Sequence, residues 1–155
     1  MADRLVIDAS VAAKWFLDDE QDVDLAEEIL LRFLQGSLEL RAPRVFRYEV
    51  CALLAKACGS KTASGNRRLS KDDGQQAVKQ LFQLGIPLSD ETEAAAAATL
   101  EKCISFSKTF KDMSYLHLAI ELDCLFCTAD GRIRDSVPPA FPTSRVLLLS
   151  DLRKP

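Results

Sequence analysis

The chain has 155 residues, and its 23 acidic residues outnumber its 20 basic ones, which gives a formal net charge of −3. A chain of this length can bury one hydrophobic core without disulfides or metals, so we expect a single domain over residues 1–155. The single histidine excludes sites built from several imidazoles, such as His-rich zinc centres and HExxH metalloproteases. The net charge, taken alone, argues against a nucleic-acid partner.

Five cysteines stand at positions without a disulfide-framework spacing, which predicts a reducing compartment, and we expect the cytoplasm. Cys124 and Cys127 form a C-x-x-C pair on a predicted strand, where residues three apart point to opposite faces. We therefore interpret both as buried small apolar groups. No apolar run approaches the ~18–20 residues of a membrane span, so no membrane contact is expected.

The first part of the chain alternates predicted strands and helices. Ser10 follows the first strand, and we expect it to cap the first helix, which leaves Asp8 free for another role. Gly36 supplies the stop of the second helix. The elements expected here are a strand over 5–7, helices over 11–16 and 25–35, a strand over 38–42 and a helix over 44–58.

The second part begins with a long loop over 59–69, rich in Gly, Ser, Thr and Asn, after which Ser70 restarts a helix with a capping-box pattern. Five consecutive alanines within 89–106 predict a closely packed helix. The remaining elements are a short strand over 85–88, a helix over 112–122 and strands over 124–128 and 145–149. This alternation predicts an α/β fold whose mostly parallel sheet is covered on both faces, with the working crevice at the carboxyl ends of the strands.

Four acidic residues fall where this fold brings side chains together. Asp8 and Asp130 directly follow predicted strands, and Glu49 and Asp112 lie on helix faces that point partly toward apolar surroundings. Convergent carboxylates need a positive partner, and with so little histidine we expect Mg²⁺ or Mn²⁺ held by oxygen ligands. Such a pocket can activate water and stabilise the charge on a phosphodiester undergoing in-line displacement.

Each acid also has a simpler explanation when it is taken alone. Asp8 or Asp112 could cap a helix, Glu49 could be a solvated helix residue, and Asp130 before Gly131 could form a turn. Their joint placement favours the functional interpretation.

Two other polar residues stand near the acids in the sequence. Asp135 is expected to be a solvated helix residue or a supporting group. His117 lies about 140° around a helix from Asp112, so we expect it to face away from the acids.

Basic residues concentrate between residues 41 and 71, where eight of them accompany a single acid, so this segment carries +7 and the remainder −10. If the helix over 44–58 brings Glu49 to the pocket, these residues lie beside the path of an RNA backbone. A solvated charged loop explains those of residues 59–69 equally well. Aromatic candidates for base stacking are few, with Tyr48 and Phe46 the only ones nearby. The candidate RNA-binding residues are Arg44, Arg47, Arg67 and Arg68.

Four short motifs carry a resemblance to a known family. They are Val6-Ile7-Asp8-Ala9-Ser10, Tyr48-Glu49-Val50, Asp112-Met113-Ser114-Tyr115-Leu116-His117-Leu118-Ala119 and Thr128-Ala129-Asp130-Gly131-Arg132. In this order and spacing they resemble the motifs of PIN-domain nucleases, and they are most similar to those of the VapC toxins of toxin–antitoxin pairs. The resemblance runs from residue 5 to about residue 149. The chain departs from the family pattern at Lys111, in the length of the 59–69 loop and in the proline-rich connection over 138–142.

The resemblance implies a PIN-like three-layer α/β/α fold with a mostly parallel sheet of about four to five strands. It implies a Mg²⁺-dependent endoribonuclease in which Asp8, Glu49, Asp112 and Asp130 bind metal and position the attacking water. Ser10 and Thr128 occupy positions whose hydroxyls support the acidic pocket in that family. The implied partners are an RNA substrate, a small antitoxin protein and a second copy of the chain.

Other functions remain open at this point. A nuclease of the same fold could process RNA or act on DNA outside a toxin–antitoxin pair, or the fold could be a degenerate, non-catalytic binding module. An aspartyl phosphotransferase would need a second acid two residues after Asp8, where this chain has Ser10. Trp15, Phe16 and Phe33 could line a partner interface, although core packing explains them equally well.

Overall fold

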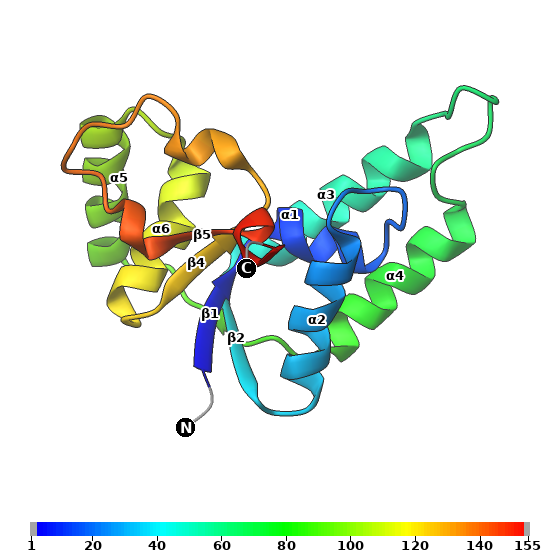
Figure 1. The fold of residues 1–155 in the computed structure, drawn as a ribbon, viewed down its shortest axis with the longest axis horizontal. Helices are drawn as coiled ribbons and strands as arrows, with labels where there is room; N and C mark the ends of the chain where they lie inside the picture. The colour runs from blue at the N-terminus through cyan, green and yellow to red at the C-terminus, as the bar shows by residue number, and fades with distance from the viewer. Residues whose placement is uncertain (1–2, 154–155) are drawn as a thin grey trace.

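A computed structural model of the protein describes residues 3–153, so the ends of the predicted domain, residues 1–2 and 154–155, lie outside the described residues. Five strands form one parallel sheet in the order β3-β2-β1-β4-β5 (Figure 1). The strands are β1 (Asp3–Ile7), β2 (Leu38–Pro43), β3 (Leu88–Ser89), β4 (Leu125–Thr128) and β5 (Val146–Leu148). The predicted three-layer α/β fold with a largely parallel sheet is confirmed.

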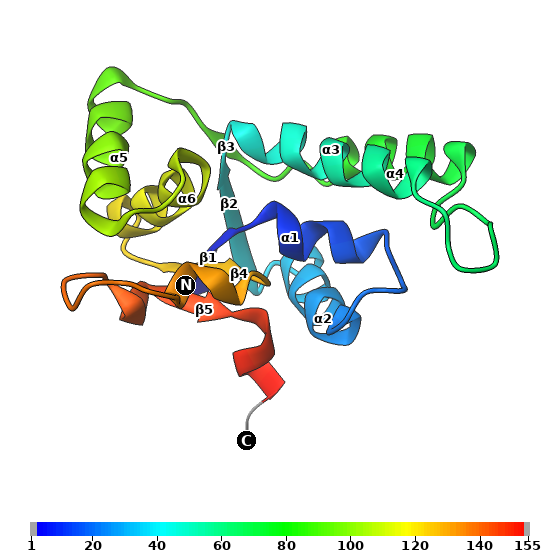
Figure 2. The same cartoon turned by 90° about the horizontal axis from the view of Figure 1, so that it is seen from above.

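Helices cover both faces of this sheet. Figure 2 shows α5 and α6 on one side of the strands and α1 to α4 on the other. Short 3₁₀ helices cover 13–15, 131–134, 143–145 and 149–153. The α-helices are α1 (Ala9–Ala12), α2 (Val23–Leu34), α3 (Val45–Gly59), α4 (Lys71–Gln83), α5 (Glu93–Phe106) and α6 (Phe110–Glu121).

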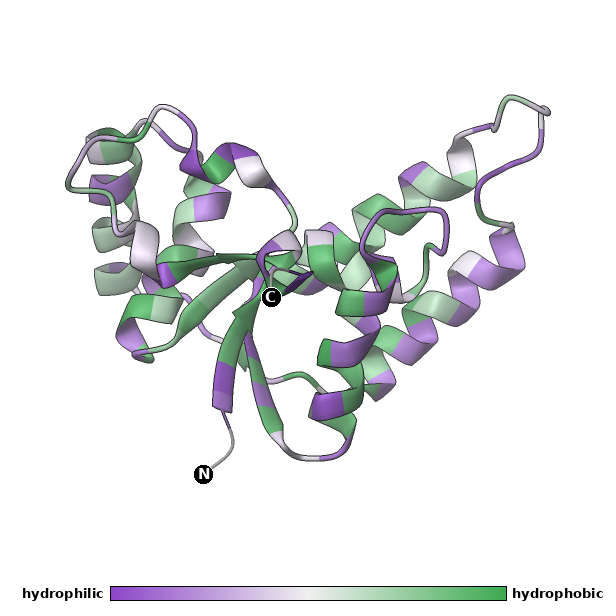
Figure 3. Ribbon diagram, viewed as in Figure 1, coloured by the Kyte–Doolittle hydropathy of each residue, from purple (hydrophilic) through white to green (hydrophobic). Residues whose placement is uncertain are grey.

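The core lies between the sheet and the helices that contact it. The ends of β1 and β4 are apolar and buried on both faces, whereas β2 alternates buried and half-buried residues. Figure 3 shows β4 as a mainly hydrophobic ribbon. Helix α6 packs directly on the sheet, and the Tyr115 ring stacks on Phe126 with 5.4 Å between the ring centroids. This packing fixes the direction of the Tyr115 hydroxyl and the rotation of α6 around its axis.

Two predicted helix starts differ from the structure. Helix α1 begins at Ala9 with Asp8 in the N-cap position, although the Asp8 side chain makes no capping bond. The expectation that Ser10 caps this helix is therefore wrong, because the Ser10 hydroxyl bonds the Asp8 carboxylate instead. Helix α6 begins two residues earlier than predicted, and its cap is Thr109, whose hydroxyl accepts a hydrogen bond from the Asp112 N–H.

Helix α5 is the other departure from the predicted pattern. It begins at Glu93 after the cap residue Thr92, while Ser89 belongs to β3. The predicted helix is present and packs closely on α6 rather than on the sheet, with Ala95, Ala96 and Ala98 half-buried and Thr99 buried. A run of alanines predicts a helix, but it does not indicate which layer of the fold that helix occupies.

The predicted loop over 59–69 connects two packed helices, α3 and α4, and extends beyond them at one end of the molecule (Figure 1). An antiparallel bridge joins Lys61 to Arg67 within it. Of the helices within residues 3–153, none is both long enough and apolar enough to cross a membrane.

Candidate active site

The carboxyl end of β1 delivers Asp8 into a buried position, where the residue is only 4% exposed. Two hydroxyls donate hydrogen bonds to its Oδ2, from Ser10 Oγ at 2.7 Å and from Thr128 Oγ1 at 2.6 Å. Burial raises the pKa of Asp8, while these hydroxyls and the nearby Lys111 lower it in part. Both bonds end on the same oxygen, so neither hydroxyl occupies the lone pairs of Oδ1.

The two hydroxyls also tie the ends of β1 and β4 together. Ser10 Oγ accepts a hydrogen bond from the Ala129 N–H at 3.0 Å, and Thr128 Oγ1 accepts one from the Asp130 N–H at 3.1 Å. Each hydroxyl thus donates to Asp8 and accepts from the segment that carries Asp130. The geometry gives Ser10 and Thr128 a positioning role at this edge of the sheet.

Glu49 reaches the same edge from the second turn of α3. Its side chain is 12% exposed, and Tyr115 donates its hydroxyl proton to Glu49 Oε1 over 3.3 Å. Burial raises the pKa of Glu49 to about 7, and the Asp8 carboxyl group contributes in the same direction. The nearby Lys111 ammonium lowers this pKa only in part, so the carboxyl group is still half protonated near neutral pH.

Lys111, in the first turn of α6, is the cation that the chain itself provides. Its Nζ lies 3.5 Å from Glu49 Oε2 and 3.8 Å from Asp112 Oδ1. Burial opposes the charged form, but Glu49, Asp112 and Asp8 outweigh it and raise the pKa of Lys111.

Asp112 and Asp130 are held by partners of their own. Asp112 Oδ2 accepts the Thr109 hydroxyl proton at 2.8 Å, which completes a reciprocal cap at the start of α6. Asp130 accepts Arg132 Nε at 2.9 Å and Nη2 at 2.7 Å, and this bidentate contact lowers its pKa. The simpler helix-cap interpretation thus describes part of what Asp112 does.

All four predicted acids lie around one positive charge. The Lys111 ammonium is within electrostatic reach of Asp8, Glu49 and Asp130 as well as Asp112. The structure therefore brings together the acids that lie far apart in the sequence. It also adds three residues that we did not predict for the site, Lys111, Tyr115 and Arg132.

The donor atoms of the site match a divalent cation in their chemistry. Four carboxylates without nitrogen or sulfur ligands suit Mg²⁺ or Mn²⁺, and the Lys111 ammonium stands where a cation is needed. Within residues 3–153, no three Asp, Glu, His or Cys side chains are placed so that they could hold a metal ion as they stand. The residues fit such an ion in chemistry, but Lys111 and Arg132 must first release the carboxylates that they contact.

The predicted RNA-binding arginines are not brought together at the acids. Arg68 donates to Asp19 and Glu20, and Arg44 pairs with Asp90 at 2.7 Å. The Arg47 guanidinium lies 4.6 Å from the centroid of the Phe82 ring. The loop with Arg67 and Arg68 follows the far end of α3, about 15 Å along the helix from Glu49.

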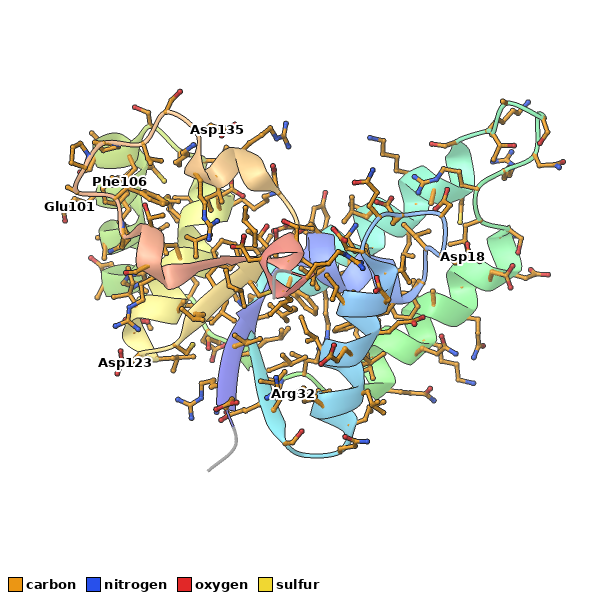
Figure 4. All side chains as sticks on the ribbon, in the orientation of Figure 1. Asp18, Arg32, Glu101, Phe106, Asp123 and Asp135 are labelled. Atoms are coloured by element: carbon orange, nitrogen blue, oxygen red, sulfur yellow. The ribbon has the colours of Figure 1, made fainter. Side chains whose placement is uncertain are left out.

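The other polar residues lie as the pattern predicted, or further from the acids. Asp135 is exposed and directly follows the 3₁₀ helix over 131–134, and Figure 4 labels it at the edge of the molecule. His117 is turned from the acids, with Nδ1 3.3 Å from Lys102 Nζ. Phe46 is buried, so it cannot stack on a base, whereas Tyr48 is 75% exposed. All five cysteines are free thiols, and Cys127 is buried.

A parallel sheet with acidic side chains at its carboxyl edge defines an α/β protein whose candidate site lies where such folds bind ligands. The PIN domain family matches residues 5–136, and the chain belongs to that family, whose members are nucleases. None of the curated proteins matches the chain in sequence.

Two solved structures share the fold. VapC20 from Mycobacterium tuberculosis, described as a sarcin–ricin-loop-cleaving toxin, has a TM-score of 0.60 and 13% identity, covering 83% of this chain and 92% of its own. PAE2754 from Pyrobaculum aerophilum has a TM-score of 0.62 and 15% identity, covering 98% of this chain and 95% of its own. At these identities the likeness establishes the fold.

Proposed function

We propose that this chain is a Mg²⁺-dependent endoribonuclease, acting in the cytoplasm as the toxin of a type II toxin–antitoxin pair. The observation that carries the proposal is the set of four acids around one ammonium at the carboxyl edge of the sheet. PIN nucleases generally use divalent metal ions, and Mn²⁺ could replace Mg²⁺ here. The likeness to VapC20, a toxin that cleaves RNA, supports the choice of RNA as the substrate.

Asp8, Glu49, Asp112 and Asp130 would hold the metal. A bound divalent cation supplies a Lewis acid at the phosphodiester and lowers the pKa of bound water. Ser10 and Thr128 fix the Asp8 carboxylate through Oδ2, and Tyr115 fixes Glu49. Lys111 and Arg132, once released from the acids, are the nearest cations to receive the negative charge of the RNA phosphate.

Cleavage of a mixed-sequence RNA in Mg²⁺, in Mn²⁺ and in EDTA tests the proposal. Asp8→Asn and Asp130→Asn should each lower the cleavage rate by more than about a hundredfold, since each removes a charged metal ligand. Asp135→Asn is the matched control, because it changes an exposed acid of the same segment and should cleave normally.

Circular dichroism and thermal unfolding establish that each variant is folded. Undiminished cleavage by Asp8→Asn would overturn the assignment of the acids, and undiminished cleavage in EDTA would overturn the metal dependence.

The toxin assignment requires a protein partner. A groove of about 390 Å³ between α2 and α4 is lined by Trp15, Phe16 and three leucines, of which Leu34 is 62% exposed. This surface supports an antitoxin that inserts apolar side chains, and a homodimer remains part of the proposal. A short reading frame beside the gene whose product co-purifies with the chain and suppresses cleavage would support the pair, whereas a housekeeping nuclease would lack it.

A further inference from the structure

A second cavity, of about 310 Å³, lies beside the acidic site between the ends of β2 and β3 and the helices α5 and α6. Lys111 lines this cavity and also contacts Glu49 and Asp112, so the cavity and the acids share one wall. The volume falls at the lower end of the range of about 300–1,000 Å³ for small-ligand pockets. It suits a single ring system better than a segment of polypeptide.

The cavity offers a flat ring an apolar enclosure with an aromatic side chain. Its apolar lining includes Pro43, Val45, Leu118 and Phe110. Phe110 directly precedes Lys111 and is 42% exposed, so its ring is accessible from the cavity. An exposed aromatic next to a phosphate-processing site is a stacking surface for bases in single-stranded nucleic acids.

The polar lining determines which part of a nucleotide can enter. Carboxylates of Asp90, Glu91 and Glu121 line the cavity, and the charge of Arg44 is already paired with Asp90. These acids repel a phosphate group but accept hydrogen bonds from amino groups. His117 lines the cavity as well, and its Nε2 lies 3.3 Å from Glu121 Oε1. The lining therefore favours a neutral ring that carries hydrogen-bond donors.

We propose that this cavity binds one base of the RNA strand whose backbone crosses the acidic site, and that it selects bases with an exocyclic amino group over uracil. The inference rests on the proposed function, because the acids set where the backbone passes. The phosphate then lies toward Lys111 and Arg132, and the adjoining base turns into the cavity beside Phe110. Such recognition of an unstacked base is how proteins read single-stranded RNA.

The sharpest test fills the cavity from α5, away from the acids. Ala95 lines the cavity, whereas Ala97 is exposed on the same helix and lies outside the lining, so Ala95→Phe and Ala97→Phe form a matched pair. Fluorescence anisotropy measures binding of labelled tetra-adenylate, tetra-cytidylate and tetra-uridylate to each variant in the Asp8→Asn background with Mg²⁺ present. Cleavage sites in a mixed-sequence RNA are mapped in parallel with Asp8 intact.

We expect tetra-adenylate and tetra-cytidylate to bind more tightly than tetra-uridylate. Ala95→Phe should weaken the first two by about tenfold or more and remove the base preference of the cleavage sites, while Ala97→Phe changes neither. Phe110→Ala should weaken binding similarly and Phe110→Tyr should not, which guards against a folding defect in one variant. An unchanged base preference in Ala95→Phe overturns the proposal. The proposal is also overturned if the parent protein is a dimer and Ala95→Phe dissociates it, since a second copy would then occupy the cavity.

The outcomes separate the two proposals. If cleavage depends on Asp8 but its base preference is the same in Ala95→Phe, the base pocket is refuted and the nuclease is retained. If the protein cleaves no RNA but binds tetra-adenylate and tetra-cytidylate selectively, and Ala95→Phe abolishes this selectivity, the nuclease is refuted and the pocket is retained.

Discussion

The buried carboxylate of Glu49 destabilises the folded state of the metal-free protein, so a variant without this charge should be more stable. Its pKa is about 7 in the folded state because burial penalises the charged form, compared with 4.5 for an unburied glutamate. Below pH 4.5 both the folded and the unfolded chain hold the proton, so the group costs nothing. As the pH rises toward 7 the unfolded chain releases the proton first, and the folded state loses stability relative to it.

The loss is complete above pH 7, where the difference between the two pKa values corresponds to about 3 kcal/mol. Solvent screening is small because the Glu49 side chain is only 12% exposed. Glu49→Gln keeps the shape of the side chain and an oxygen that can accept the Tyr115 hydroxyl, but it has no proton to lose. The contact with Lys111 already lowers the pKa of Glu49, so its loss in the variant is included in the figure of about 3 kcal/mol. We therefore expect a gain of about 3 kcal/mol at pH 8 and less than about 1 kcal/mol at pH 5.

Urea unfolding followed by circular dichroism, in EDTA at pH 5, 6, 7 and 8, measures this gain. A gain of about 3 kcal/mol should raise the melting temperature by about 6–12 °C in a chain of this size. Glu39→Gln is the control, because hydrogen bonds from Arg41 and Arg4 lower the pKa of Glu39 and the same substitution should not stabilise the protein. A Glu49→Gln variant that is no more stable than the wild type at pH 8, or equally stabilised at every pH, would refute burial as the cause.

Three further substitutions test other parts of the structure by urea unfolding. Thr128→Val removes a hydroxyl that donates to the buried Asp8 carboxylate, so stability at pH 8 should fall by about 1–3 kcal/mol, and an unchanged midpoint would contradict the role assigned to this bond. Arg68→Ala removes the ion pairs that tie the 59–69 loop to the acidic segment before α2, and should cost about 1 kcal/mol or less in low salt and still less in high salt. In Gly74→Ala the new Cβ would lie 2.5 Å from Cys58 Sγ, so the variant should be destabilised in the wild type but stabilised by up to about 1 kcal/mol when Cys58→Ala is also present.

The four acids could be found from the sequence because each is tied to a local pattern. Asp8 and Asp130 end apolar β-branched or buried runs, and parallel strands bring their carboxyl ends to one edge. Glu49 and Asp112 depend on helical periodicity, which gives a direction toward the core without naming the neighbour. Fold and acid placement thus follow from short-range signals repeated along the chain.

The cations at the site could not be found in the same way. Lys111 and Asp112 are adjacent in α6, where successive side chains point about 100° apart, so their shared contact depends on the length and flexibility of the lysine side chain. The bond from Thr128 to Asp8 joins residues separated by 120 positions, and it is this tertiary arrangement that outweighed the local preference of Ser10 for a helix cap.

The net charge misleads for a related reason. The segment between residues 41 and 71 carries +7, but Arg41 pairs with Glu39, Arg44 with Asp90 and Arg68 with Asp19. Three of the eight basic side chains are therefore already neutralised by carboxylates of this chain. A count of charges along the sequence cannot separate the paired arginines from the available ones.

The proposed function assigns the contact with an RNA backbone to two cations of the acidic site, Lys111 and Arg132. In the metal-free protein, Lys111 contacts Glu49 and Asp112, and Arg132 contacts Asp130. A divalent cation that neutralised the carboxylates in their place would free both side chains to contact the phosphate. The same binding event would thus leave two cations available for RNA. Metal binding and RNA binding should therefore strengthen each other, since each favours the same withdrawal of Lys111 and Arg132 from the carboxylates.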